Sequence, residues 1–258
     1  MKPTIVLVHG AFAESSSWNG VIGKLRSAGH PVIAAPNPLR SLSGDAAVLS
    51  AVLSGIDGPV VLVGHSYGGA VASNAAVGHD HVKALVFVAA FAPERGESIF
   101  DLSGKFPGST LGDTLNQVPL ADGTADLYIR QDAFHQQFTA DVTAEHAALA
   151  AATQRPLNTT ALNEPSGEPA WKTVPSWFIY PGLDHNIPVE AHRFMAERAG
   201  SRRSVELPGA SHALPVSEPA AVADLILAAA ELVRSPPVPA RRMAARRRAG
   251  TPSTAGPR

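Results

Sequence analysis

The segment VVLVGHSYGGA, residues 60–70, places Ser66 between two glycines at the junction of two kinds of secondary structure. The four apolar residues before Gly64 are typical of a fully buried strand, and the alanine-rich residues after Gly68 are typical of a closely packed helix. A serine on such a turn is held in a strained backbone conformation, and only very small residues fit two positions before and after it. The spacing Gly-x-Ser-x-Gly therefore predicts a reactive serine at the carboxyl end of a sheet, where open α/β sheets bind ligands.

The first 233 residues alternate between strand-like and helix-like segments. The predicted strands are residues 4–8, 31–35, 59–63, 82–90, 175–180 and 203–207. The predicted helices are residues 18–25, 44–55, 67–78, 188–199 and 217–233. Because strands and helices that alternate form crossover units, we expect an α/β fold with a mostly parallel sheet of about six strands and helices on both faces.

One interval breaks this alternation. Residues 94–175 contain no convincing buried strand, although residues 141–153 form an alanine-rich, helix-like segment. The large aromatic residues of the interval include Phe100, Phe106, Phe134, Phe138 and Trp171. Because a long loop without structure is rare inside a compact domain, we expect a helical cap inserted over one end of the sheet. The core would then comprise residues 1–93 and 176–233.

Residues 234–258 differ from the rest of the chain in charge. They contain seven Arg and no acidic residue, which leaves 14 Lys and Arg against 22 Asp and Glu in residues 1–233. A body with a net charge of −8 does not indicate a nucleic-acid enzyme. The tail is rich in Pro, Arg and Ala, so we expect it to be disordered, either as a solvated tail or as an electrostatic tether.

The chain contains no Cys, which excludes disulfides, thiolate catalysis and cysteine-based metal sites. The strand predicted at residues 4–8 leaves no room for a signal peptide before it, so we expect a cytoplasmic protein. No uninterrupted run of about 18 apolar residues is present, so no membrane span is expected.

A serine hydroxyl becomes a good nucleophile when a neighbouring base takes its proton, and a third group must hold that base in the correct tautomer. On a sheet of this kind the expected chain order is Ser, acid, His. His212, in LPGASHALPVS, follows the last predicted strand and precedes the last predicted helix, so it would lie at the same end of the sheet as Ser66. His185 and His192 are alternatives, and we expect His192 on a helix surface.

The acid is predicted in FIYPGLDHNIP, which follows the strand at residues 175–180 and contains Asp184. Its carboxylate could instead cap the helix that starts near Pro188, a frequent role for Asp in such a loop. Further candidates for the acid within the predicted cap are Asp101, Asp122 and Asp126.

Acyl chemistry also needs hydrogen-bond donors for the oxyanion of the tetrahedral intermediate. The backbone N–H of Tyr67 is one candidate, because it lies at the start of its helix. The second candidate is in the loop VHGAFAESSSW, where Gly10 would let the backbone turn and Ala11 would donate. Phe12 is the neighbouring alternative, and the loop could also be merely a turn stabilised by glycine.

Four segments, HGAF, GHSYGG, YPGLDHNIP and GASH, resemble the α/β-hydrolase superfamily in their order and separation. More narrowly, they resemble bacterial single-domain carboxylesterases that are similar to plant methyl esterases and hydroxynitrile lyases. The resemblance covers residues 3–233. It implies a nucleophile, acid and base at Ser66, Asp184 and His212, with Ala11 and Tyr67 as oxyanion donors. It also implies an apolar pocket under the cap, and the candidates for its lining are Phe12, Phe91 and Trp171.

Two departures narrow the predicted function. Hydroxynitrile lyases of this type carry Thr and Lys where this chain has Gly10 and Ala213, and related dehalogenases and epoxide hydrolases have Asp in place of Ser66. The sequence therefore predicts an esterase for small to medium esters with an apolar part, acting as a monomer or homodimer without cofactor or metal. A cofactor-free perhydrolase resembling haloperoxidases, or a non-catalytic protein that binds ligands in a hydrolase pocket, remains an alternative.

Overall fold

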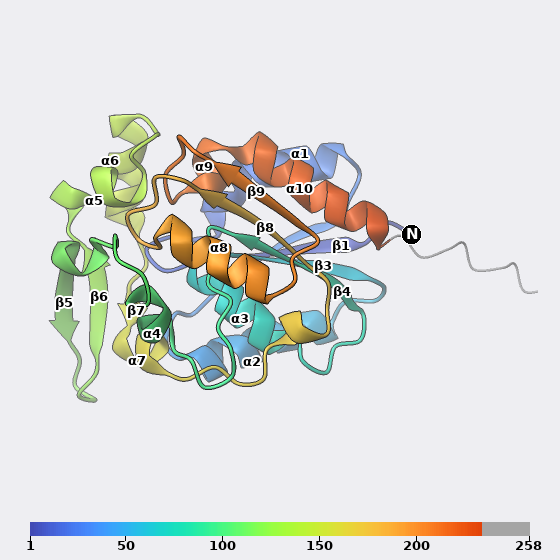
Figure 1. Cartoon of the computed structure of the whole chain (residues 1–258), viewed down its shortest axis with the longest axis horizontal. Helices are drawn as coiled ribbons and strands as arrows, with labels where there is room; N and C mark the ends of the chain where they lie inside the picture. Colours follow the sequence, from blue (N-terminus) through green and yellow to red (C-terminus); the bar gives the residue numbers. More distant parts are fainter. Residues whose placement is uncertain (234–258) are drawn as a thin grey trace, which may run out of the picture.

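The central sheet has six parallel strands in the order β2-β1-β3-β4-β8-β9 (Figure 1). Their bounds are β1 (Thr4–Val8), β2 (Val32–Ala35), β3 (Val60–His65), β4 (Val82–Val88), β8 (Ser176–Pro181) and β9 (Arg203–Leu207). These bounds come from a computed structural model that describes residues 1–233, so the tail predicted to be disordered lies outside the described residues. The sheet and its covering helices confirm the predicted α/β fold class.

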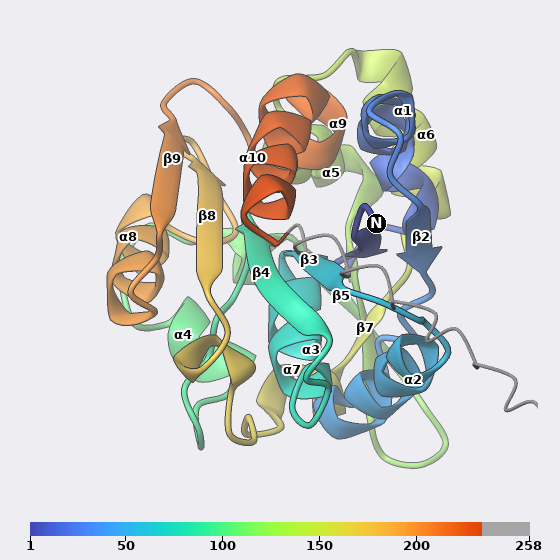
Figure 2. The ribbon, with the colours of Figure 1, turned by 90° about the vertical axis from the view of Figure 1, so that its right-hand side faces the viewer.

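Apolar side chains on both faces of the strands bury the sheet between two layers of helices. In β1, Ile5 and Leu7 pack into one apolar cluster, and Val6 and Val8 pack into the other. Each of these side chains is at most 1% exposed, and burying one such side chain contributes about 1.5–3 kcal/mol to stability. One layer contains η1 (Ser15–Trp18), α1 (Asn19–Ser27), α9 (Leu214–Ser217) and α10 (Pro219–Leu232). The other contains α2 (Leu42–Ser54), α3 (Tyr67–Ala75) and α8 (Val189–Arg198), as Figure 2 shows from the side.

The chain between β4 and β8 contains the insertion predicted at residues 94–175. Its elements are α4 (Ile99–Ser103), η2 (Leu111–Thr114), β5 (Leu115–Pro119), β6 (Ala125–Ile129), α5 (Gln131–Phe138), α6 (Ala144–Thr153), β7 (Leu157–Asn158), α7 (Thr159–Asn163) and η3 (Ala170–Lys172). The strands β5, β6 and β7 form a separate antiparallel sheet, so the insertion is not built from helices alone. No residue of β5 is buried, and the strand therefore lacks the apolar pattern of a buried strand.

The insertion lies over the end of the central sheet at which the strands have their carboxyl ends. In Figure 1, α5, α6, β5 and β6 lie at the left, at the end of the molecule away from the N-terminus. Because all six central strands are parallel, their carboxyl ends and the loops that follow them meet at this end. Within residues 1–233, no helix is both long enough and apolar enough to cross a membrane.

Candidate active site

Ser66 lies on a tight turn between β3 and α3, with φ 53° and ψ −125°. A positive φ in a residue with a side chain costs about 1–3 kcal/mol, and such strain persists only where the surroundings impose it. A Cβ at Gly64 would lie 2.4 Å from the Gly68 carbonyl oxygen, and a Cβ at Gly10 would lie 2.5 Å from Ser66 Cβ. Close approach of other atoms therefore requires glycine at both positions, whereas we had expected Gly10 to serve a sharp backbone turn.

The structure brings Ser66, Asp184 and His212 together. His212 lies in the loop between β9 and α9, and Asp184 lies in the loop after β8. Ser66 Oγ is 2.9 Å from His212 Nε2, and His212 Nδ1 is 2.7 Å from Asp184 Oδ2. Because a carboxylate only accepts hydrogen bonds, Nδ1 of the neutral ring carries the proton and Nε2 accepts from the Ser66 hydroxyl. The imidazole therefore stands between hydroxyl and carboxylate in the orientation of a general base.

The carboxylate of Asp184 accepts four hydrogen bonds. Oδ1 accepts the backbone N–H groups of Asn186 at 2.8 Å and Ile187 at 3.0 Å, and Oδ2 accepts His212 Nδ1–H and His192 Nε2–H. Burial by itself would raise the pKa of Asp184, but the two imidazoles and their hydrogen bonds outweigh burial and hold it below its ordinary value. Oδ1 thus holds the loop before α8 through two backbone N–H groups, a role similar to the helix capping considered above. Oδ2 accepts from the two histidines.

The structure places the alternative candidates elsewhere. The prediction that His192 lies on a helix surface is wrong, because the side chain belongs to the inward face of α8 and is fully buried. The side chain of His185 is exposed. Asp101 accepts from Ser98 in the capping box of α4, Asp122 accepts from Thr124, and Asp126 pairs with Arg40 at 2.7 Å.

The two predicted oxyanion donors both line the cavity that contains Ser66. Among the described residues, neither Ala11 N–H nor Tyr67 N–H has a hydrogen-bond acceptor in the protein. The N–H of Phe12, the alternative donor, is already used, because it donates to the Arg155 carbonyl oxygen at 2.9 Å. The Tyr67 hydroxyl donates to Asp45 Oδ2 at 2.8 Å, so this side chain points away from the cavity and Tyr67 offers only its backbone.

Two further buried histidines hold the loops around Ser66. His9 Nδ1–H donates to the Gly10 carbonyl oxygen at 2.9 Å, and His65 Nε2–H donates to the His212 carbonyl oxygen at 3.0 Å. Burial lowers the pKa of His9 to about 4. Burial and the neighbouring His212 ring lower the pKa of His65 to about 3. Both rings are therefore neutral near pH 7 and act as hydrogen-bond donors with a defined tautomer.

The cavity at Ser66, named here the Ser66 cavity, has a volume of about 320 Å³. Its walls are mostly apolar side chains from the core and the insertion, among them Phe12, Phe91, Ile99, Leu127, Phe138 and Leu162. The structure does not bring Trp171 to these walls, contrary to our expectation. The Trp171 indole N–H donates to the Pro93 carbonyl oxygen at 3.0 Å, and Arg198 lies over the ring, so the side chain is used for packing behind the site.

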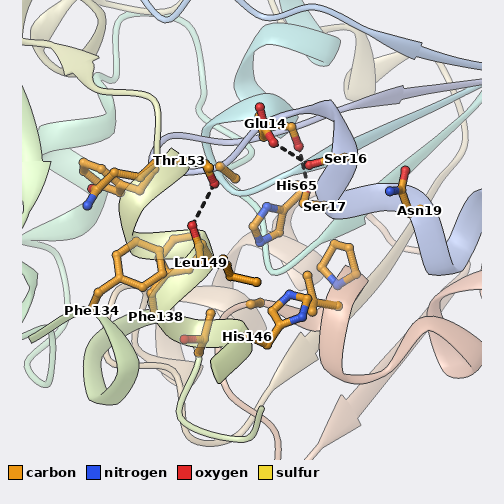
Figure 3. Close-up of a pocket in the computed structure, with 18 of the residues that line it drawn as sticks. Glu14, Ser16, Ser17, Asn19, His65, Phe134, Phe138, His146, Leu149 and Thr153 are labelled. Carbon is orange, nitrogen blue, oxygen red and sulfur yellow. Dashed lines mark hydrogen bonds between the residues drawn. The ribbon is translucent and has the colours of Figure 1, made fainter. Parts of the chain in front are cut away.

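A second cavity of about 430 Å³ lies behind the Phe12 and Phe138 side chains, which line both cavities. Figure 3 shows it between η1, α5 and α6, with Glu14, Ser16 and His65 on one side and His146 and Leu149 on the other. Neither Ser66 nor His212 lines this second cavity. It therefore adjoins the Ser66 cavity without containing the Ser66 or His212 side chain.

The insertion contacts both loops that carry Asp184 and His212, and sequence reasoning missed these contacts. Gln137 donates to the His185 carbonyl oxygen at 2.8 Å and to Asn186 Oδ1 at 2.9 Å, next to Asp184. Asp141 accepts from the backbone N–H of Ser211 at 2.9 Å and from its hydroxyl, next to His212. No local pattern marks these residues, because their partners are distant in sequence.

Metal ions need several His, Asp or Glu side chains that converge on one point. Residues 1–233 contain no cluster of at least three such side chains arranged to hold a metal ion. The absence of a cofactor from the reaction stays a prediction of the sequence.

The chain belongs to the alpha/beta hydrolase family, whose signature it matches over residues 5–225. It is 34% identical over 113 residues to the carbendazim hydrolyzing esterase of Nocardioides sp. (strain SG-4G). This alignment covers 39% of this chain and 47% of the relative. The chain is 32% identical over 118 residues to "Probable hydrolase R7" of a Phoma species, over 40% of this chain and 48% of the relative. The aligned parts thus span just under half the length of these curated relatives.

The solved structure of polyneuridine aldehyde esterase superposes on this chain with a TM-score of 0.75 and 22% identity. The superposition covers 88% of this chain and 99% of the other. At this identity the likeness concerns the fold, and it agrees with the sheet order and the family assignment described above.

Proposed function

We propose that this chain is a serine carboxylesterase that cleaves small to medium esters with an apolar part. The observation that carries the proposal is the hydrogen-bonded series from Ser66 Oγ through His212 to Asp184, which lies at one wall of a ligand-sized cavity. The names of the curated relatives, an esterase and a hydrolase, support the same class.

In the proposed reaction, Ser66 Oγ attacks the ester carbonyl carbon while His212 Nε2 takes the hydroxyl proton. The carbonyl oxygen becomes an oxyanion and accepts hydrogen bonds from the N–H groups of Ala11 and Tyr67. When the C–O bond to the alcohol breaks, His212 returns the proton to the leaving oxygen. Water then attacks the acyl-enzyme with the same assistance and releases the acid. Asp184 keeps Nδ1 protonated and stabilises the imidazolium in both halves.

The walls of the Ser66 cavity suggest which ester fits. Among the described residues that line it, none is Lys, Arg, Asp or Glu, and the polar side chains other than Ser66 and His212 include Ser103, Ser109 and Asn186. Burying a charged acyl group among such walls is unfavourable because no opposite charge compensates its lost hydration. We therefore infer a preference for neutral esters, with an acyl chain limited by a volume of about 320 Å³.

Intact-protein mass spectrometry after fluorophosphonate treatment, on the wild type and on Ser66→Ala, tests the proposal. We expect one adduct on the wild type and none on the variant, and a p-nitrophenyl ester series then sizes the acyl site. Absence of an adduct on the folded wild type would contradict the esterase and favour a ligand-binding protein. Halide oxidation with acetate and peroxide would instead indicate the perhydrolase. Cytoplasmic location and the monomeric or dimeric state stay predictions of the sequence.

A further inference from the structure

The carboxylate of Asp184 serves two imidazoles through one oxygen atom. His212 Nδ1 lies 2.7 Å from Asp184 Oδ2, and His192 Nε2 lies 3.0 Å from the same atom. The His192 side chain comes from α8 and is fully buried, so solvent does not compete for this hydrogen bond. The proposed reaction gives His212 a role but leaves His192 without one.

The state of His192 follows from its contacts. Because Oδ2 of a carboxylate accepts, Nε2 of His192 carries a proton. Its Nδ1 is buried and has no hydrogen-bond partner among the described residues. In an imidazolium this nitrogen would be a buried donor without an acceptor, which is costly, so the contacts favour a neutral ring with Nδ1 unprotonated. Burial also lowers the pKa of His192. The ring stacks on Tyr180, with centroids 5.4 Å apart and planes 7° apart, so its orientation is defined by packing.

We propose that His192 is a positioning residue for the proposed triad. His192 holds Asp184 Oδ2 in place, and together with His212 it shares the negative charge of the Asp184 carboxylate. The inference rests on the proposed function, because it assigns His192 a role through the acid and base of that mechanism. Two backbone N–H groups hold Oδ1, but they leave the carboxylate free to tilt about the Oδ1 side. At Oδ2 the His192 N–H adds a second contact to that of His212, and it opposes this tilt without taking part in the proposed proton transfer.

The shared oxygen also predicts an electrostatic effect. A hydrogen bond donated to a carboxylate disperses its charge, so less of the charge of Asp184 stabilises a protonated His212. Removing the His192 donor should therefore favour the protonated form of His212 and move the acid limb of kcat/KM to higher pH. The other titratable groups facing Asp184, His192 and His212 are Glu206 of β9, Tyr180 of β8 and His65 at the end of β3, and none is altered by the substitution.

The test compares His192→Phe, which keeps a planar ring against Tyr180 but has no donor, with His192→Gln, which keeps an N–H donor. His30→Leu is the matched control, because it removes another buried histidine whose Nδ1 contacts only the Pro3 carbonyl oxygen. We expect kcat of His192→Phe to fall roughly 3- to 10-fold, with KM nearly unchanged, and its acid limb to rise by about 0.5–1 pH unit. We expect His192→Gln to restore most of both properties, and His30→Leu to change neither.

A second readout does not depend on turnover. In protein labelled with ¹⁵N-histidine, the NMR titration midpoint of His212 should rise in His192→Phe and stay near the wild-type midpoint in His192→Gln and His30→Leu. An unchanged midpoint in folded His192→Phe would overturn the inference whatever the activity. If His192→Phe does not fold, His192→Met, which is flexible and also lacks a donor, takes its place with the same expected rise. If the wild type neither turns over esters nor reacts with fluorophosphonate, the proposed function fails while the titration still decides the role of His192.

Discussion

The Ser66 cavity and the second cavity share the Phe12 and Phe138 side chains, yet their polar groups are connected differently. The Ser66 cavity has a volume of about 320 Å³ and the second cavity about 430 Å³, so size does not single out the proposed active site. Both are lined by serine and histidine side chains. In the second cavity, however, Ser16 Oγ donates directly to Glu14 Oε1 at 2.6 Å (Figure 3).

The difference lies in the imidazole that stands between hydroxyl and carboxylate. An ordinary carboxylate is too weak a base to take a serine proton near pH 7, whereas a neutral imidazole can take it and return it to a leaving group. Ser66 has such an imidazole at 2.9 Å, and Ser16 has none at hydrogen-bond distance among the described residues. Residue types alone therefore do not define the site, because the order of hydrogen bonds decides what they can do.

The largest expected effect comes from removing each cavity's serine hydroxyl. We expect Ser66→Ala to lower kcat/KM for p-nitrophenyl acetate by about four to six orders of magnitude, because the proposed nucleophile is lost. Ser16→Ala should stay within about twofold of the wild type, as is usual for an exposed side chain. Steady-state kinetics on both variants check this, and a large loss in Ser16→Ala would break the distinction between the cavities.

The carboxylates give the next comparison. Asp184→Asn replaces the acceptor of His212 Nδ1–H by an amide that can donate, which favours the wrong imidazole tautomer. We expect kcat to fall by roughly four orders of magnitude, by analogy with other triads. Glu14→Gln keeps an oxygen for the Ser16 hydroxyl and should leave kcat within about twofold. If Glu14→Gln lost activity comparably, the second cavity would be part of the catalytic machinery.

Two buried neutral histidines, His9 and His65, predict how stability depends on pH. The folded-state pKa values of His9 and His65, about 4 and about 3, lie below the ordinary value of 6.5, so the unfolded chain binds more protons as pH falls. The free energy of unfolding should therefore decrease as pH falls from about 6.5 towards 4, by up to about 1.4 kcal/mol per pH unit for each histidine.

Urea unfolding at several pH values between 5 and 7 would measure this slope. The slope is proportional to the number of protons that the chain takes up on unfolding. His65→Phe should reduce that number by close to one, because it removes one of the groups that titrate on unfolding. Asp184, whose pKa is lowered in the folded state, contributes stability that is lost only at more acidic pH, below this window. A slope that is the same in His65→Phe and the wild type would contradict a neutral His65 in the folded protein.

A more selective effect, confined to long acyl esters, tests which cavity holds the acyl chain. Ser103 lines the Ser66 cavity and Ala150 lines the second cavity, so Phe at each position adds bulk to one cavity at a time. We expect Ser103→Phe to lower kcat/KM for long p-nitrophenyl acyl esters by roughly 10- to 100-fold and to spare the acetate. Ala150→Phe should leave the chain-length profile unchanged. A shifted profile in Ala150→Phe would show that substrate reaches past Phe12 and Phe138.

The elements that the sequence predicted well are those with a local signal. The apolar runs of the central strands face helices on both sides, so their pattern is strong in single segments. The turn at Ser66 is likewise local, since Gly64 and Gly68 crowd each other across it. The positions of Asp184 and His212 after strand ends were predictable because parallel strands bring their following loops to one edge.

The strands of the insertion carry a much weaker signal. In β5 no residue is buried, and β6 is only partly buried, so neither reads as a buried strand. β5 and β6 pair as neighbours in sequence, whereas the pairing of β6 with β7 depends on residues distant in sequence, such as Leu127 opposite Leu157. The prediction that Trp171 lines the pocket failed for a related reason. An aromatic residue in the insertion can pack against the core as readily as it can line a cavity.

The sequence by itself determined the sheet, the strained serine, and the chain order of serine, acid and histidine, because each depends on neighbouring residues or on strand direction. Only the tertiary structure decided that His192 turns inward onto Asp184, that Phe12 N–H is already used by Arg155, and that the polar groups of the second cavity lack an intervening imidazole. These features depend on which backbone and side-chain groups meet once the chain has folded, and their geometry is set by packing rather than by any repeating pattern in the chain.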